Sequence, residues 1–116
     1  MSIEIEDIVN LCVYKRLVQV AKAKELITYS EIVPLIDTKI NSPRDPRLGK
    51  ILREICSYEV HNGRPMLGSV VVHKVDRRPG KGYFKGAQNL GLFSGGDKYT
   101  FWESELNKVY RYWSSH

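Results

Sequence analysis

Apolar residues recur at helical spacing along much of the chain, and the clearest pattern begins at residue 45. Apolar side chains follow there at i, i+3, i+4 and i+7, at Leu48, Ile51, Leu52 and Ile55. Asp45 and Pro46 supply a helix-capping residue and a proline at the first helical position. Gly63 suits the left-handed conformation after a helix end. The pattern predicts a helix that ends before His61.

Two further helices are predicted upstream. Residues 6–25 place apolar side chains near a 3.6-residue repeat, with acids first and bases later, which complements the helix dipole. Thr28 and Glu31 then have the spacing of a capping box and open a second helix. Pro34 is expected to keep that second helix short or kinked. The segment 37–44 is polar and is expected to form a turn.

The second half of the chain begins with a β-type pattern. Residues 66–75 contain three consecutive valines and are predicted to form a mostly buried strand, followed by a Pro/Gly surface turn over 77–82. A short helix is predicted over 83–90. A linker then leads to a last helix, whose capping box is assigned to Thr100 and Glu103. Its aromatic face, predicted mainly to pack on the core, consists of Trp102, Leu106, Val109, Tyr110 and Trp113.

This order of elements predicts the fold class. Three helices followed by a strand and a basic loop are typical of a winged helix-turn-helix. The prediction is an α+β, mainly helical fold: one winged-helix-like domain over residues 1–116 with a C-terminal amphipathic helix. The length of 116 residues fits one hydrophobic core and is too short for two.

Positive charge is concentrated in residues 63–86. This stretch holds six basic residues against one acid, so its net charge of +5 equals that of the whole chain. Such clustering on a strand and loop is typical of a polyanion site, and nucleic acid is the commonest polyanion. The predicted contacts in this stretch are Arg64, His73, Lys74, Arg77, Arg78, Lys81 and Tyr83. Many small basic proteins bind no particular polyanion, so charge alone leaves the partner open.

The third predicted helix adds a second group of cations. Arg44, Arg47, Lys50 and Arg53 lie near its start, where a recognition helix would enter a major groove. The alternative is a solvated helix face without a partner.

The two cysteines, Cys12 and Cys56, both stand among apolar residues and are predicted to be buried. Their number and spacing fit neither a zinc site nor a disulfide framework, which favours a reducing compartment. The acidic N-terminus does not resemble a signal peptide, and no apolar run approaches the length of a membrane span. We therefore expect a cytoplasmic protein without membrane contact.

Other chemistries find little support. His61 beside Asn62 is compatible with a metal-dependent nuclease, but no further ligands stand at suitable spacing. Gly80-x-Gly82 lacks the remainder of a dinucleotide fingerprint, and a phosphate-binding P-loop is absent from the sequence. His73 with Tyr29 or Ser69 does not form a complete catalytic set. We expect no metal and no cofactor, and an enzyme is the less favoured interpretation.

Four segments between residues 27 and 86 resemble, in order, the DNA-binding half of the O6-alkylguanine-DNA alkyltransferases and their non-enzymatic alkyltransferase-like relatives. Residues 27–32 (ITYSEI) resemble that family's V-T-T-Y-G-x-I-A, and 47–53 (RLGKILR) resemble its R-x-V-G-x-A-L-R recognition helix with a shift of one residue. Residues 71–75 (VVHKV) fall where the family carries P-C-H-R-V. Residues 80–86 resemble the Gly/Tyr-rich loop that follows.

The departures from this pattern matter for chemistry. Val72 stands where the family has its alkyl-accepting cysteine, so the resemblance implies a protein that reads a modified base without repairing it. Tyr29 matches the tyrosine that presses on the target phosphate, His73 the histidine after the missing cysteine, and Tyr83 a tyrosine of the pocket-lining loop. Pro46 stands at the position of the family's intercalating arginine, with Arg44 and Arg47 nearby.

Two functions from different classes follow. The first is a non-catalytic DNA-binding protein of alkyltransferase-like type that senses a modified or flipped base. The second is a small binding module for a nucleotide or an acidic protein partner, such as a regulatory or anti-defence factor. In that module the nucleotide pocket would be lined by Arg64, Lys74, Arg77 and Lys81.

Overall fold

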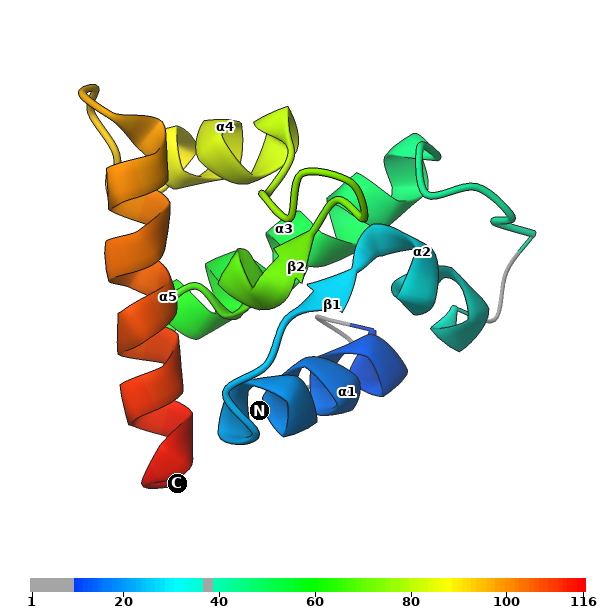
Figure 1. Ribbon diagram of the computed structural model, residues 1–116, viewed down its shortest axis with the longest axis horizontal. Helices are drawn as coiled ribbons and strands as arrows, with labels where there is room; N and C mark the ends of the chain where they lie inside the picture. Colours follow the sequence, from blue (N-terminus) through cyan, green and yellow to red (C-terminus); the bar gives the residue numbers. More distant parts are fainter. Residues whose placement is uncertain (1–9, 37–38) are drawn as a thin grey trace, which may run out of the picture.

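The computed structural model describes residues 10–36 and 39–116, and within them five α-helices surround a two-stranded sheet (Figure 1). In chain order the elements are α1 (Leu11–Lys22), β1 (Ile27–Thr28), α2 (Tyr29–Ile32), α3 (Pro46–His61), β2 (Val71–Val72), α4 (Lys81–Asn89) and α5 (Lys98–Ser114). Short 3-10 helices cover Val33–Leu35 and Leu67–Val70. The radius of gyration is 13.4 Å, close to the value of about 13 Å typical of a compact 100-residue domain. The chain is therefore one compact, mostly helical domain.

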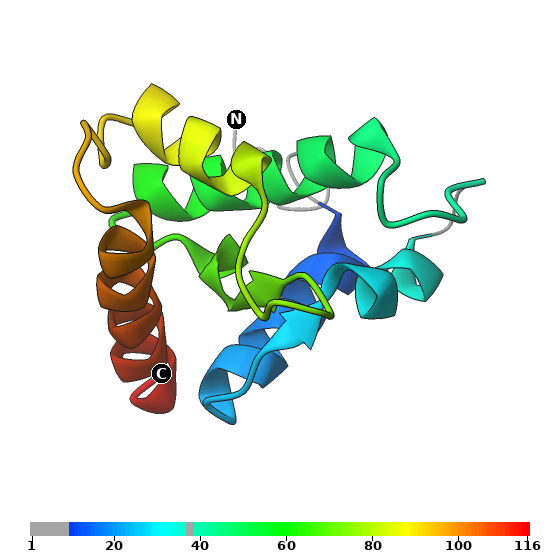
Figure 2. The ribbon, with the colours of Figure 1, turned by 45° about the horizontal axis from the view of Figure 1, so that its top comes forward.

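The core has two adjoining parts. The larger part gathers buried side chains of α1, α3, both strands and α5, among them Leu17, Ile55 and Val109. The smaller part lies between α3, α4 and α5 and is rich in aromatic and sulfur-containing side chains. Figure 2 shows α4 alongside α3 on one side of the sheet, with α1 on the other and α5 across one end. The packing of α4 on α3 creates the groove in which the candidate site lies.

The start and end of α3 agree with the prediction to within one residue. The Asp45 carboxylate accepts a hydrogen bond from the Arg47 N–H, and Pro46 takes the first helical position. The helix runs through His61, one residue past the predicted end. Gly63 follows with φ of 74°, the left-handed conformation that favours glycine.

The capping box of the second helix is confirmed. Thr28 Oγ1 accepts a hydrogen bond from the Glu31 N–H, and the Glu31 carboxylate accepts one from the Thr28 N–H. Pro34 lies in the 3-10 helix that follows at once, so α2 is limited to four residues. The second helix is short, as predicted.

The strand predicted over residues 66–75 is wrong for most of its length. Only two residues form β2, and the 3-10 helix Leu67–Val70 precedes them. The Ser69 hydroxyl lies 2.7 Å from the Tyr83 hydroxyl, and its carbonyl accepts a hydrogen bond of 2.8 Å from the Trp102 indole. These partners satisfy the buried polar groups of Ser69 in a helical turn, so tertiary contacts override the β propensity of the valines.

The basic loop that follows β2 is a tight turn rather than a hairpin. The two strands pair in parallel, with Ile27 beside Val71 and Thr28 beside Val72. After β2 the chain turns back over residues 73–78, closed by a hydrogen bond of 2.9 Å from the His73 N–H to the Arg78 carbonyl. The predicted surface turn at 77–82 therefore begins earlier, and α4 starts at Lys81, two residues before its predicted start.

The helix predicted over residues 6–25 is shorter at its C-terminal end. Its first residues lie outside the described part of the chain, and α1 follows the side-chain cap of Asn10. The helix ends at Lys22, because Lys24 adopts the left-handed conformation with φ of 55°. Cys12 on this helix is exposed, contrary to prediction, since its side of α1 faces solvent; Cys56 on α3 is buried, as predicted.

The last helix begins three residues earlier than predicted. The cap is Asp97, whose carboxylate accepts hydrogen bonds from the Tyr99 N–H and the Thr100 hydroxyl. The Thr100 capping assignment is therefore wrong. Trp102 and Val109 are buried, which agrees with the predicted role of this face in core packing.

Candidate functional site

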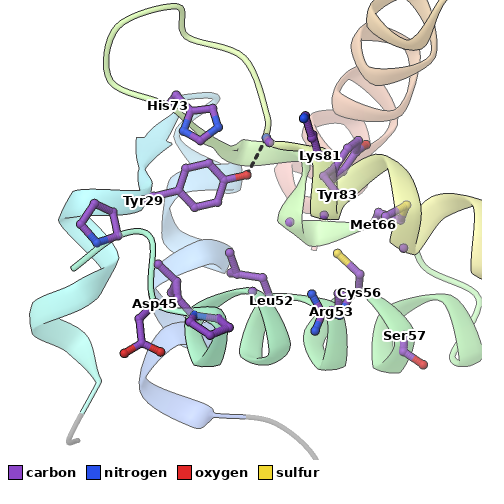
Figure 3. A pocket seen from close by; sticks show the side chains of 18 of the residues that line it. Tyr29, Asp45, Leu52, Arg53, Cys56, Ser57, Met66, His73, Lys81 and Tyr83 are labelled. Atoms are coloured by element: carbon purple, nitrogen blue, oxygen red, sulfur yellow. Dashed lines mark hydrogen bonds between the residues drawn. The ribbon is translucent and has the colours of Figure 1, made fainter. Parts of the chain in front are cut away.

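A pocket of about 780 Å³ opens between α3, the segment before it and the start of α4 (Figure 3). Its volume lies within the range of roughly 300–1,000 Å³ that is typical of small-molecule sites. The walls include apolar side chains such as Leu52 and Met66. Six of the twelve site residues selected from the sequence line the pocket: Tyr29, Arg44, Arg53, His73, Lys81 and Tyr83. Residues from four separate segments thus meet around one cavity.

One corner of the pocket is built by Tyr29, His73 and Gly80. The Tyr29 hydroxyl accepts a hydrogen bond of 2.9 Å from the Gly80 N–H, and its ring centroid lies 4.7 Å from that of His73. A Cβ atom at Gly80 would lie 3.0 Å from His73 Nε2 and 3.4 Å from the Tyr29 hydroxyl. Burial raises the pKa of Tyr29, so the phenol stays protonated and can donate a hydrogen bond.

The Arg53 side chain lies in a trough between α3 and α4 that three glycines form. A Cβ atom would lie 3.1 Å from Arg53 Nη1 at Gly49, 3.8 Å from the same atom at Gly82, and 3.7 Å from Arg53 Cγ at Gly86. Within the described part of the chain no carboxylate pairs with Arg53. Its positive charge is therefore available to a ligand in the pocket.

The segment that leads into α3 contributes both free and paired charge. Arg44 lines the pocket and is exposed, whereas Arg47 donates two side-chain hydrogen bonds to Asp45, of 3.0 and 2.7 Å. The Arg47 hydrogen bonds lower the pKa of Asp45 from 3.8 to about 2, so this carboxylate is ionised at neutral pH. Lys50 is exposed on α3 and does not line the pocket.

The turn formed by residues 73–78 carries exposed cations just outside the pocket. Lys74, Arg77 and Arg78 are exposed, and none of them lines the cavity. Arg78 lies over the ring of Tyr99, 4.2 Å from its centroid, which is a cation–π contact. These cations flank the cavity instead of forming its wall.

The structure places Arg64 elsewhere. Its guanidinium donates two hydrogen bonds, of 3.0 and 2.9 Å, to the carboxylate of Glu59, which is fully buried. Tyr14 from α1 donates a third, of 2.7 Å. Arg64 therefore neutralises the buried Glu59 carboxylate between α1 and α3. It is not part of the candidate site. Of the four residues expected to line a nucleotide pocket, only Lys81 does so.

Cys56 is a pocket residue that the sequence reasoning missed. It follows Leu52 by four positions on α3, so the helical repeat that places Leu52 at the pocket also places Cys56 there. Burial raises the pKa of its thiol to about 12. A protonated thiol is a weak nucleophile at neutral pH. Val72, which the sequence resemblance aligns with the reactive cysteine of the alkyltransferases, is fully buried and does not line the pocket.

The alternative chemistries suggested by the sequence involve groups that are engaged elsewhere. Ser69 is buried against Tyr83 and does not line the pocket beside His73. The His61 ring contacts the Ser57 carbonyl one turn earlier in α3. Among residues 10–36 and 39–116, no three His, Cys, Asp or Glu side chains are grouped to hold a metal ion.

None of the helices in the described residues combines the length and the apolar character needed to cross a membrane. No protein-family model, curated protein or solved structure matches this chain.

Proposed function

We propose that this chain is a non-catalytic DNA-binding protein of alkyltransferase-like type, which holds a modified or flipped base in the pocket beside α3. In this proposal α2 and α3 act as the helix-turn-helix and the turn 73–78 acts as a reduced wing. The family resemblance supplies the expected order of these parts.

The observation that carries the proposal is the convergence of Tyr29, Arg53, His73 and Lys81 on one pocket. A flipped base needs an apolar cavity, hydrogen-bond donors and phosphate contacts that offset the cost of unstacking. The pocket combines apolar walls with the half-buried phenol of Tyr29 and with the cations Arg44, Arg53 and Lys81. In this proposal the Tyr29 hydroxyl donates to the phosphate of an extruded nucleotide, the role that the family resemblance implies for it.

The exposed cations around the pocket support binding to a polyanion. Arg44 and Lys81 line the pocket, Lys50 is exposed on α3, and the turn 73–78 adds three more basic side chains. Contacts of this kind neutralise phosphates without reading sequence, and their contribution falls as salt rises. Arg47 contributes less, because Asp45 neutralises much of its charge.

The protonation state of the Cys56 thiol favours a protein that binds modified bases over an enzyme that transfers alkyl groups. Cys56 is the cysteine at this cavity, and its raised pKa keeps it protonated at neutral pH. Alkyl transfer requires a thiolate, so a reader of modified bases fits the pocket better than a repair enzyme.

Fluorescence anisotropy of a labelled duplex tests the proposal. The duplex is titrated with protein at about 50 and about 200 mM salt, between which affinity is expected to fall about a hundredfold or more. A second duplex carries one O6-methylguanine and is expected to bind more tightly. Arg53→Ala is expected to weaken binding to both. Its matched control is Arg111→Ala, an exposed arginine on α5 outside the pocket.

The outcomes separate the two functions inferred from the sequence. Absence of binding to either duplex at low salt would overturn the DNA proposal. Thermal stabilisation by a mononucleotide, with none from the duplex, would instead favour the small nucleotide-binding module. Equal affinity for both duplexes would retain DNA binding and remove base sensing.

A further inference from the structure

Val75 is the most exposed large apolar residue in the described part of the chain. Its relative exposure is 95%, and Leu92 at 41% is the other member of that group. An isolated exposed apolar side chain is common on protein surfaces and needs no explanation by itself. Two further features distinguish Val75, namely the way its turn is held and the charges around it.

The turn that carries Val75 is held at both ends. The His73 N–H donates to the Arg78 carbonyl at 2.9 Å, and the Arg77 N–H donates to the His73 carbonyl at 3.1 Å. The Asp76 carboxylate accepts the Arg78 N–H at 3.0 Å. These bonds close the turn at its base and leave Val75 exposed between them. A preordered turn loses little conformational entropy when it meets a partner.

The turn also contains a strained residue. Arg77 has φ of 57°, a conformation that glycine adopts freely and that other residues rarely take. Backbone strain of this kind clusters at binding and catalytic sites. Lys24 at the end of α1 adopts the same conformation, so the strain at Arg77 fixes the shape of the turn and does not by itself assign a role to its charge.

The charges beside Val75 suit one class of partner. Lys74, Arg77 and Arg78 are exposed neighbours of Val75 in the turn, with the Arg78 guanidinium over the Tyr99 ring. The single acid of the turn, Asp76, accepts a hydrogen bond from the Arg78 N–H. His73, at the base of the turn, lines the pocket. Figure 3 shows the chain rising from His73 above the pocket before it returns to the hydrogen bond with Tyr29.

We propose that Val75 is an apolar contact to DNA, which enters a groove of the bound duplex and packs on sugars and base edges while the neighbouring cations meet phosphates. Proteins that bind the minor groove combine basic side chains with apolar side chains that contact the base steps. This inference rests on the proposed function and assigns a contact outside the pocket.

Substitutions at the turn test the proposal through the salt dependence of duplex binding. Val75→Ala removes apolar contact but no charge, so affinity is expected to fall roughly three- to tenfold. The slope of log affinity against log salt is expected to stay unchanged. Lys74→Ala is expected to reduce that slope by about one, the change for one lost phosphate contact. Leu92→Ala is the matched control and is expected to leave both quantities unchanged.

The full chain is used throughout, and circular dichroism verifies that each variant is folded. Loss of affinity in Val75→Ala with an unchanged salt slope supports the groove contact. Wild-type affinity in that variant overturns it while DNA binding by the protein stands. An equal loss in Leu92→Ala also overturns it, because the effect would then be general. If the wild-type protein binds no duplex, the inference fails together with the proposed function.

Discussion

The hydroxyl of Tyr29 accepts a hydrogen bond of 2.9 Å from the backbone N–H of Gly80, which lies 51 positions later in the chain. This bond joins the first residue of α2 to the residue that precedes α4. The space at Gly80 is tight, since a Cβ atom there would approach both Tyr29 and His73. One phenol thus fixes the corner of the pocket at which three separate segments meet.

Tyr29→Phe keeps the ring and removes the acceptor of the Gly80 N–H. We expect the free energy of unfolding to fall by about 1 kcal/mol, the net value of a typical hydrogen bond, and duplex affinity to fall as well. Urea denaturation and anisotropy measure the two effects. Tyr110→Phe is the control, because it removes a hydrogen bond to the Glu25 carbonyl outside the pocket. Equal loss of affinity in both variants would show that Tyr29 has no special role.

Asp45→Asn separates helix capping from charge neutralisation. Asparagine also caps helices well, so the loss of stability at neutral pH is expected to be limited to the exposed ion pair with Arg47. Arg47 loses its carboxylate partner, and we expect tighter duplex binding with a steeper salt dependence. Glu103→Gln, on α5, makes the same change in net charge as a control. An identical gain in both variants would assign the effect to net charge alone.

The same substitution predicts a change in acid stability. The pKa of Asp45 is lower in the folded protein, at about 2, than its ordinary value of 3.8. The ionised group therefore stabilises the fold above pH 3.8, and this contribution is lost as pH falls towards 2. In Asp45→Asn that part of the acid dependence is expected to be absent when stability is measured by denaturation between those pH values.

Elements with local signals were predicted best from the sequence. The start of α3 depends on Asp45 and Pro46, and the start of α2 on Thr28 and Glu31, so neighbouring residues contain the needed information. The conformation of residues 66–75 is not determined by neighbouring residues alone. It depends on hydrogen bonds to side chains 14 and 33 positions away from Ser69, which a local pattern does not contain.

The candidate site was likewise only partly predictable from the sequence. The sequence showed that basic residues are clustered in 63–86 and near the start of α3. It could not separate paired from unpaired cations. Nothing in the sequence pattern separates Arg64 from Arg53. In the structure Arg64 forms an ion pair with Glu59, whereas Arg53 lines the pocket. Only tertiary structure distinguishes a cation that stabilises the fold from one that can meet a ligand.

Glu59→Ala tests the structural assignment of Arg64. The variant leaves the Arg64 guanidinium and the Tyr14 hydroxyl without their shared partner, and breaking a buried pair in this way costs about 3–5 kcal/mol. Glu59→Gln keeps an acceptor and is expected to cost less. Urea denaturation measures both. A loss below about 1 kcal/mol in Glu59→Ala would contradict the assignment, since that is typical of a surface pair.

The two cysteines are expected to differ sharply in reactivity. Cys12 is exposed, whereas Cys56 is buried and the pKa of its thiol is raised to about 12. A disulfide reagent at mildly alkaline pH should therefore modify one thiol quickly in the folded protein and the second only in denaturant. Peptide mass mapping identifies the labelled residue. Equal rates for both thiols in the native protein would contradict the burial of Cys56.

Arg77→Gly separates the conformational cost of the turn from the use of its charge. A left-handed conformation costs most residues about 1–2 kcal/mol, and glycine avoids this while it adds flexibility to the unfolded chain. The free energy of unfolding is therefore expected to stay constant or to rise slightly. Duplex affinity is expected to fall, with the salt slope reduced by about one.

Lys24 provides the matched control for this substitution, because it is also a basic residue in the left-handed conformation, with φ of 55°. Lys24→Gly should change stability in the same way as Arg77→Gly and leave duplex binding as it is, since Lys24 lies at the end of α1 outside the pocket. A salt slope that changes equally in both variants would mean that the two cations contribute only to overall charge. A change confined to Arg77→Gly would mean that the charge of Arg77 meets a phosphate.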